Sequence, residues 1–182
     1  MFDTILLPTD GSDHAAAAAE TGIELATAHD ATVHVVCVAD TGPLGDLRLP
    51  GDAASAEDAI RGQAREYVDE IVDRAEAAGL AVTGTVLEGA AAEALLEYAR
   101  DIDADLIVIG SRGRGGVHRL AMGSVTDHVI RFGDVPVFVA NSALWTTESP
   151  GVTTSADSPH VTISLIASVR RPIDQPMHAR PA

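Results

Sequence analysis

One glycine-rich stretch in the C-terminal half of the chain contains most of the residues that could bind a ligand. An apolar run at 106–109 ends at Gly110, and a loop with more glycines and three arginines follows. After this loop, Gly123 and Ser124 precede apolar residues at helical spacing, and Gly133 ends the pattern. The stretch therefore predicts a buried strand, a glycine loop and a helix with Ser124 at its N-cap.

Such a loop suits the binding of an anion such as phosphate. Backbone N–H groups in a glycine loop and in the first turn of a helix point outward unpaired and carry partial positive charge. Glycine lets the backbone approach a ligand closely, and some of these positions are expected to need positive φ. The alternative is that the glycines only make turns and the arginines are solvated, but the flanking strand and helix favour anion binding. The glycines of the loop are Gly113, Gly115 and Gly116, and its arginines are Arg112, Arg114 and Arg119.

The spacing Gly110-x2-Gly113-x9-Gly123-Ser124 resembles the ATP-binding signature of the universal stress protein family. The likeness covers about residues 1–142 and includes the surrounding string G-S-R-G-R-G-G-V-x-R-L-x-x-G-S-V. It implies that ATP, with the Mg²⁺ that normally accompanies it, is the ligand. The nucleotide-binding residues that it implies are Pro8, Thr9, Asp10, Val38, Gly110, Ser111, Arg112, Gly113, Arg114, Gly123, Ser124 and Val125.

The resemblance also implies what each part of this set does. Asp10 lies by the nucleoside, where its carboxylate accepts hydrogen bonds from ribose hydroxyls or the adenine amine; it also suits the cap of the next helix, and both roles can hold. Thr9 lends its backbone to the same pocket, and Val38 meets the adenine unless it is simply core. The phosphates are cradled by Gly110, Gly113, Gly123 and Ser124, flanked by Ser111 and Val125, with the outer phosphates in reach of Arg112 and Arg114.

No catalytic or metal-binding set stands out in the sequence. His118 and His128 have no partner at metal-ligand spacing and are interpreted as structural or solvated. Cys37, the single cysteine, lies in an apolar run and is expected to pack in the core. Because the chain contains no lysine, a Walker A phosphate loop and a protein-kinase site are both excluded.

The composition indicates an acidic protein of the cytoplasm. The chain has 182 residues and a formal net charge of −15, so nonspecific binding of nucleic acid is not expected. Its start does not resemble a signal peptide, and no apolar run is long enough to span a membrane. High acidity without lysine and many small residues are also typical of proteins that work in concentrated salt, which gives the hypothesis of a halophilic habitat.

Strands that alternate with helices are predicted to position these residues. The alternation predicts an α/β fold, a doubly wound five-stranded parallel sheet with helices on both faces. The family resemblance implies a Rossmann-like, adenine nucleotide alpha hydrolase-like fold with strand order 3-2-1-4-5, in which the loops after strands one and four face one crevice. Strands are expected at residues 3–8, 31–38, 80–87, 106–109 and 135–140. Helices are expected from an N-cap at Ser12 or Asp13 to about residue 29, at 55–78, at about 91–101, and from the N-cap Ser124 to residue 132.

The chain is expected to divide into a nucleotide-binding domain at 1–142 and a Ser/Thr/Pro-rich, flexible extension at 143–182. The resemblance implies an ATP-binding stress-response or regulatory module, not an enzyme, that forms a homodimer through the strand at 135–140. Two alternatives stay open. One is a slow ATPase or nucleotidyl-transferring enzyme on the same fold, and the other is an interaction module without a ligand.

Overall fold

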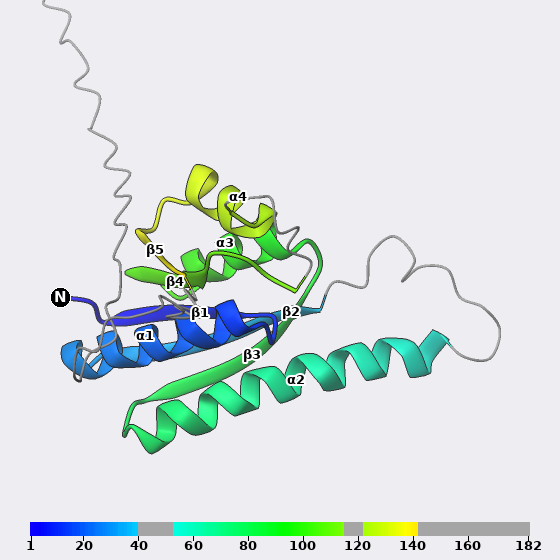
Figure 1. The fold of residues 1–182 in the computed structure, drawn as a ribbon, viewed down its shortest axis with the longest axis horizontal. Helices are drawn as coiled ribbons and strands as arrows, with labels where there is room; N and C mark the ends of the chain where they lie inside the picture. The colour runs from blue at the N-terminus through cyan, green and yellow to red at the C-terminus, as the bar shows by residue number, and fades with distance from the viewer. Residues whose placement is uncertain (40–52, 115–121, 142–182) are drawn as a thin grey trace, which may run out of the picture.

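A computed structural model of the chain describes residues 1–39, 53–114 and 122–141. These residues form a parallel sheet of five strands in the order β3-β2-β1-β4-β5 (Figure 1). The α/β prediction is confirmed, and so is the strand order that the family resemblance implied. The strands are β1 Thr4–Thr9, β2 Thr32–Ala39, β3 Val82–Glu88, β4 Leu106–Gly110 and β5 Val137–Ala140.

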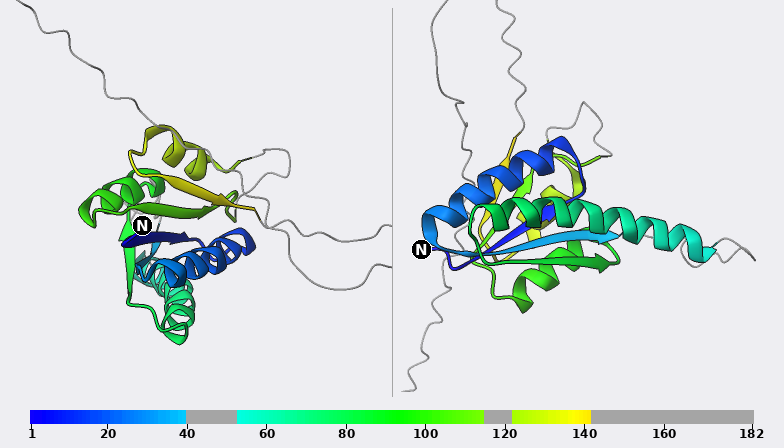
Figure 2. Two further views of the ribbon diagram at one scale, coloured as in Figure 1. Left: turned by 90° about the vertical axis from the view of Figure 1, so that its left-hand side faces the viewer. Right: turned by 90° about the horizontal axis from the view of Figure 1, so that it is seen from below.

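Helices cover both faces of this sheet and divide the hydrophobic core into two layers. The first layer lies under α1 and α2 and the second under α3 and α4 (Figure 2). Both layers are built from small and aliphatic side chains, which allows the helices to pack closely on the strands. The helices are α1 Asp13–His29, α2 Ala53–Ala77, α3 Ala91–Asp101 and α4 Ser124–Phe132.

The central strands are apolar along their length because helices bury them from both sides. Ile5 in β1 and Ile107 and Val108 in β4 have no exposed surface. The outer strand β3 is less buried, as expected for an edge, and Gly84 in its middle has a packing role. A Cβ atom on Gly84 would lie 2.6 Å from Cγ1 of Val68, so the glycine lets α2 approach the edge strand closely.

Asp105 fastens the amino ends of two central strands to each other. Its Oδ2 accepts hydrogen bonds from the backbone N–H groups of Asp3 (2.8 Å) and Thr4 (3.0 Å), and its own N–H donates to the Thr4 carbonyl at 2.9 Å. The bonds to the carboxylate favour its charged form, so they hold the pKa of Asp105 below its ordinary value of 3.8. A single side chain thus joins the start of β4 to the start of β1.

Most element ends lie within one or two residues of the sequence prediction, and two of the differences have a clear physical reason. Gly123, not Ser124, is the N-cap of α4, because Gly123 has extended backbone angles and its carbonyl accepts the first helical hydrogen bond from Asp127 at 2.9 Å. The last strand begins at Val137 instead of residue 135. Pro136 still accepts a hydrogen bond from Ile107 through its carbonyl, but a proline has no N–H to donate to the sheet.

Several predicted features lie outside the described residues. They are Gly115, Gly116, His118 and Arg119 of the glycine loop, and the extension at 143–182. In the parts of the chain that the structure describes, no helix is both long enough and apolar enough to cross a lipid bilayer.

Candidate functional site

The order of the strands reverses between β1 and β4, which lie side by side in the sheet (Figure 1). A cavity of about 650 Å³ opens at the carboxyl ends of β1, β2 and β4. This switch point is where open α/β sheets usually bind ligands. The structure brings the sequence-predicted residues together here: every member of the set except Ser111 lines the cavity. They come from the carboxyl ends of three strands, from the segments that follow β1 and β4, and from the first turn of α4, so the fold and not sequence proximity assembles the site.

The turn from β1 to α1 forms one wall of the cavity, and Asp10 organises it. The Asp10 Oδ1 accepts a hydrogen bond from the N–H of Ser12 (3.1 Å), and its Oδ2 accepts one from the N–H of Arg114 (2.8 Å). Thr9 accepts a further bond from the N–H of Gly11 through its hydroxyl at 3.2 Å. The helix cap itself is Ser12, whose hydroxyl accepts from the N–H of Ala15. Asp10 therefore ties the glycine loop to the β1 turn, and it also lines the cavity.

The described loop glycines are needed for close approach and not for unusual backbone angles. Gly110, Gly113 and Gly123 all lack positive φ, whereas Gly11, Gly79 and Gly89 have it; the expectation of positive φ at some loop positions extends to Gly115 and Gly116, which lie outside the described residues.

Each of two loop glycines fits against a neighbour that leaves no room for a side chain. A Cβ on Gly110 would lie 2.8 Å from the backbone carbonyl of His14, and one on Gly113 would overlap Oδ2 of Asp10. Steric contact thus explains both glycines.

The first turn of α4 provides the opposite wall. Gly123 cannot offer its amide to a ligand, because this N–H already donates to the carbonyl of Ser111 at 2.8 Å. The amides of Ser124 and Val125 follow in the first turn, where no carbonyl of the helix is in position to accept them. As the N-cap residue is a glycine, no side chain caps them either. These amides and the positive end of the helix dipole make the wall suited to an anion.

The two arginines of the described loop differ in their surroundings. Arg112 is partly buried, and its Nε is shielded from solvent without any hydrogen-bond partner among the described residues. Arg114 is exposed, and its guanidinium carbon lies 5.3 Å from the ring centre of Tyr67 on α2. Both residues line the cavity. A shielded N–H donor without an acceptor is costly, so Arg112 is a position at which a bound anion would be stabilised.

Apolar side chains from α3 and from the sheet complete the cavity, and sequence reasoning did not assign them to the site. Ala91 and Leu95 of α3 line it together with Val36 of β2, next to the predicted Val38. Leu95 is also part of the buried face of α3. The position of α3 beyond the switch point gives this role to Leu95, and no local pattern in the sequence carries that information.

Thr126 is a second residue that the sequence did not reveal. It is buried, and its hydroxyl donates a hydrogen bond to the Gly110 carbonyl at 2.8 Å, which connects α4 to the end of β4. Ser111, predicted to flank the phosphate-cradling glycines, is not among the residues that line the cavity, although its neighbours Gly110 and Arg112 are. Its hydroxyl donates to Oδ1 of Asn141 (3.2 Å) and its N–H to the Ala140 carbonyl (2.8 Å), so it ties the loop to the end of β5.

Cys37 and His128 have the structural roles that the sequence predicted. Burial, helped by the nearby Asp10 carboxylate and opposed by Arg114, raises the pKa of the Cys37 thiol to about 11, which is the behaviour of a core cysteine. His128 lies 3.8 Å from a carboxylate oxygen of Glu93 and packs against the ring of Phe132. Over residues 1–39, 53–114 and 122–141, no three His, Cys, Asp or Glu side chains are grouped so that they could hold a metal ion.

Known proteins resemble the chain over the part that contains this site. The model of the Universal stress protein family matches residues 1–141. Universal stress protein MJ0531 of Methanocaldococcus jannaschii is 33% identical over 139 residues, 76% of this chain and 82% of that protein. The structure of universal stress protein UspA from Lactobacillus plantarum matches with a TM-score of 0.66 and 25% identity, over 75% of this chain and 96% of that one. The structure of a universal stress protein in complex with cAMP matches with a TM-score of 0.59 and 27% identity, over 76% and 96%.

Proposed function

The chain belongs to the universal stress protein family, and from this premise we propose that its cavity binds ATP together with Mg²⁺. The family's role is in the stress response, so the bound nucleotide would regulate a stress-response module. The relative solved in complex with cAMP, 27% identical, supports an adenine nucleotide as the kind of ligand. The cavity volume of about 650 Å³ is also in the range of small-molecule sites.

The observation that carries the proposal is that Arg112, whose shielded Nε has no acceptor among the described residues, lines the same cavity as the first turn of α4. Both features stabilise negative charge, because one is a permanently charged donor and the other is the positive end of a helix. Phosphate oxygens would satisfy them together. The apolar wall that contains Val38 and Leu95 would receive the flat adenine ring.

We further propose that binding occurs without rapid turnover. Asp10 is the only acidic residue among the described residues that line the cavity, and both of its oxygens accept backbone hydrogen bonds. A carboxylate committed in this way is poorly placed to activate water as a general base. The Mg²⁺ would arrive with the phosphates, as it usually does for nucleotides, and a few protein ligands would suffice.

The proposal predicts that Mg-ATP stabilises the fold. At about 100 times its dissociation constant, ATP should raise the free energy of unfolding by about 2.7 kcal/mol, measured as a thermal shift at a fixed salt concentration. Arg112→Gln should weaken ATP binding about tenfold, because a charge-assisted hydrogen bond is lost. The same ATP concentration should then raise the free energy of unfolding of the variant by only about 1.4 kcal/mol.

Arg100→Gln is the matched control for charge. Arg100 lies on α3, exposed and 3.8 Å from Asp134, so its loss should leave the ATP-induced shift unchanged. A wild-type protein that shows no shift with Mg-ATP would contradict the proposal. Chromatography of the nucleotide after incubation separates the alternatives, since steady production of ADP or AMP would instead favour the enzyme hypothesis.

We also propose that two copies associate through β5. This strand is one edge of the sheet, and the carbonyls of Pro136 and Ala140 accept hydrogen bonds from the β4 side. Since backbone groups alternate along a strand, the N–H groups of Val137 and Val139 are directed to the open edge. An open edge of this kind can pair with a second copy.

A further inference from the structure

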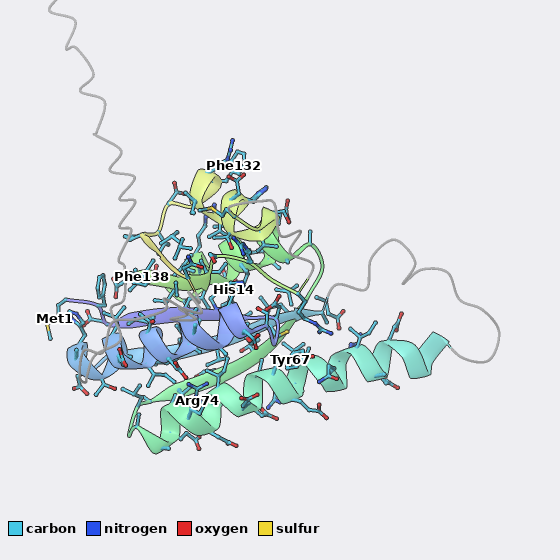
Figure 3. All side chains as sticks on the ribbon, viewed as in Figure 1. Met1, His14, Tyr67, Arg74, Phe132 and Phe138 are labelled. Carbon is cyan, nitrogen blue, oxygen red and sulfur yellow. The ribbon has the colours of Figure 1, made fainter. Side chains whose placement is uncertain are left out.

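Tyr67 on α2 contacts the candidate site although it is far from the glycine loop in the sequence. The Tyr67 ring is half-buried and packs against Gly11, so closely that a Cβ atom at position 11 would overlap the ring. The guanidinium of Arg114 lies over the same ring, with 5.3 Å between Cζ and the ring centre. Figure 3 labels Tyr67 on the part of α2 that lies alongside the sheet. One aromatic side chain therefore joins α2 to the β1 turn and to the loop after β4.

Arg114 is held at two points, and Tyr67 provides one of them. The backbone N–H of Arg114 donates to Oδ2 of Asp10 at 2.8 Å, which fixes where the side chain starts. The ring of Tyr67 then attracts the guanidinium through its negative face. Arg114 is exposed, and an exposed arginine without such a contact would sample many rotamers. The ring therefore limits where this positive charge can be.

The two cations of the cavity consequently occupy different environments. Arg112 is partly buried with a shielded Nε, whereas Arg114 is exposed at the rim, on the side where α2 passes. An anion that reaches only into the buried part would meet Arg112 alone. An anion with more charged groups, extending towards the rim, would also meet Arg114.

We propose that Tyr67 is a positioning residue that holds Arg114 at the cavity rim for the outer phosphates, so that it sets the preference for a nucleoside triphosphate over a monophosphate. The inference rests on the proposed function and deepens it, because it names the residue through which the cavity would sense phosphate number. Tyr67 itself is not among the residues that line the cavity. It acts through Arg114, and its effect should therefore depend on that arginine.

The test compares the affinities of Mg-ATP and AMP by isothermal titration calorimetry at one salt concentration. In wild-type protein, ATP should bind more tightly than AMP. Tyr67→Leu should reduce the ratio of the two affinities by about two- to fivefold, the size expected when an exposed cation–π contact is lost. Tyr67→Phe should keep the ratio, because the aromatic ring is retained. AMP affinity should be the same in all three proteins, which also checks that each variant is folded.

A double-mutant cycle with Arg114→Gln separates positioning of the arginine from a general structural effect. The Tyr67→Leu change should lower the ratio in the wild-type background and leave it unchanged in the Arg114→Gln background. Tyr98→Phe is the control for loss of a hydroxyl, since Tyr98 is on α3 and contacts His34 and Thr85.

The outcomes distinguish this inference from the function on which it rests. If wild-type protein prefers ATP and Tyr67→Leu keeps the full preference, the role of Tyr67 is refuted while nucleotide binding stands. The role of Tyr67 would also be refuted if Tyr67→Leu lowered the ratio of ATP to AMP affinity equally in the wild-type and the Arg114→Gln backgrounds. If the wild-type protein binds neither nucleotide, the proposed function fails, and this inference fails with it.

Discussion

At the scale of single residues, the glycines of the site are spacers that fit against particular neighbours. Gly110 is next to the backbone carbonyl of His14, and Gly113 is next to the carboxylate of Asp10. The first contact involves two backbones, which cannot move apart without shifting β4 or α1. The second involves one short side chain, held by the N–H groups of Ser12 and Arg114. A substitution at Gly113 should therefore act through Asp10.

This gives a prediction for Gly113→Ala. The new methyl group should displace the Asp10 carboxylate and break its hydrogen bond with the N–H of Arg114, which should lower the free energy of unfolding by about 1 kcal/mol. Urea unfolding at neutral pH measures this difference. In an Asp10→Ala background the same change should have almost no effect, because the obstructing carboxylate is gone. Equal losses in the two backgrounds would show that Gly113 is needed for another reason.

Sequence reasoning located most residues of the cavity but not how they contact one another. Asp10 was expected to face a nucleoside or to cap a helix, and in the structure it joins two loops that lie 104 positions apart. Tyr67 could not have been identified, because nothing near it in the sequence suggests a site. Its contact with Arg114 depends on how α2 lies across the sheet, which is a property of the packing of the whole core.

At the scale of elements, the apolar runs and the helical periodicity were sufficient to predict each helix and strand of the described residues, and the differences are confined to their ends. Ser124, the expected N-cap, is the first residue inside α4, because Gly123 has the extended backbone of a cap and its carbonyl accepts the first helical hydrogen bond. Patterns of apolar residues specify which face is buried, whereas an element's end depends on individual hydrogen bonds. The strand order came from the family resemblance, since the strands of a parallel sheet look alike in sequence.

The Asp105 contact predicts a pH dependence at this scale. Its pKa is lower in the folded than in the unfolded protein, so its carboxylate stabilises the fold above pH 3.8, and this contribution is lost as the pH falls through the folded-state pKa. Asp105→Asn should therefore lower the free energy of unfolding at pH 7, and its difference from wild type should shrink below pH 3.8. Chemical denaturation at several pH values measures both curves.

Asp73→Asn on α2 removes the same charge without these backbone partners, so it serves as the control. Its difference from wild type should be small at every pH, as for most exposed substitutions. If Asp105→Asn behaved in the same way as this control, the hydrogen bonds from Asp3 and Thr4 would not stabilise the joined strands.

At the scale of the whole molecule, charge and association are coupled. Residues 144–182 contain three arginines and three acidic residues, so the entire net charge of −15 belongs to residues 1–143. Two such bodies repel each other when they meet. Salt screens this repulsion, and the Debye length falls from about 10 Å at 0.1 M to about 3 Å at 1 M.

The proposed association through β5 should therefore strengthen with salt. Sedimentation equilibrium should give a dimer that is at least a few-fold tighter at 1 M than at 0.1 M salt, which is also what the hypothesis of a halophilic protein would require. Val139→Pro should prevent the dimer, because it removes an N–H group from the open edge while the carbonyls that β4 uses remain. A dimer that persists in this variant would place the contact elsewhere, and the unfolding temperature checks that the variant is folded.

The hydrogen bonds from Ser111 to Ala140 and Asn141 indicate where a dye could be attached to detect ligand binding in the cavity. Because the N–H of Ser111 donates to the Ala140 carbonyl, a dye attached at position 141 would sit beside the loop after β4, although replacing Asn141 removes its own hydrogen bond with the Ser111 hydroxyl. The chain has only one natural thiol, and Cys37 is buried with a pKa of about 11, so a cysteine introduced there would be labelled selectively. The exposed Met1, at the opposite end of the strands (Figure 1), is the neutral place for a purification tag.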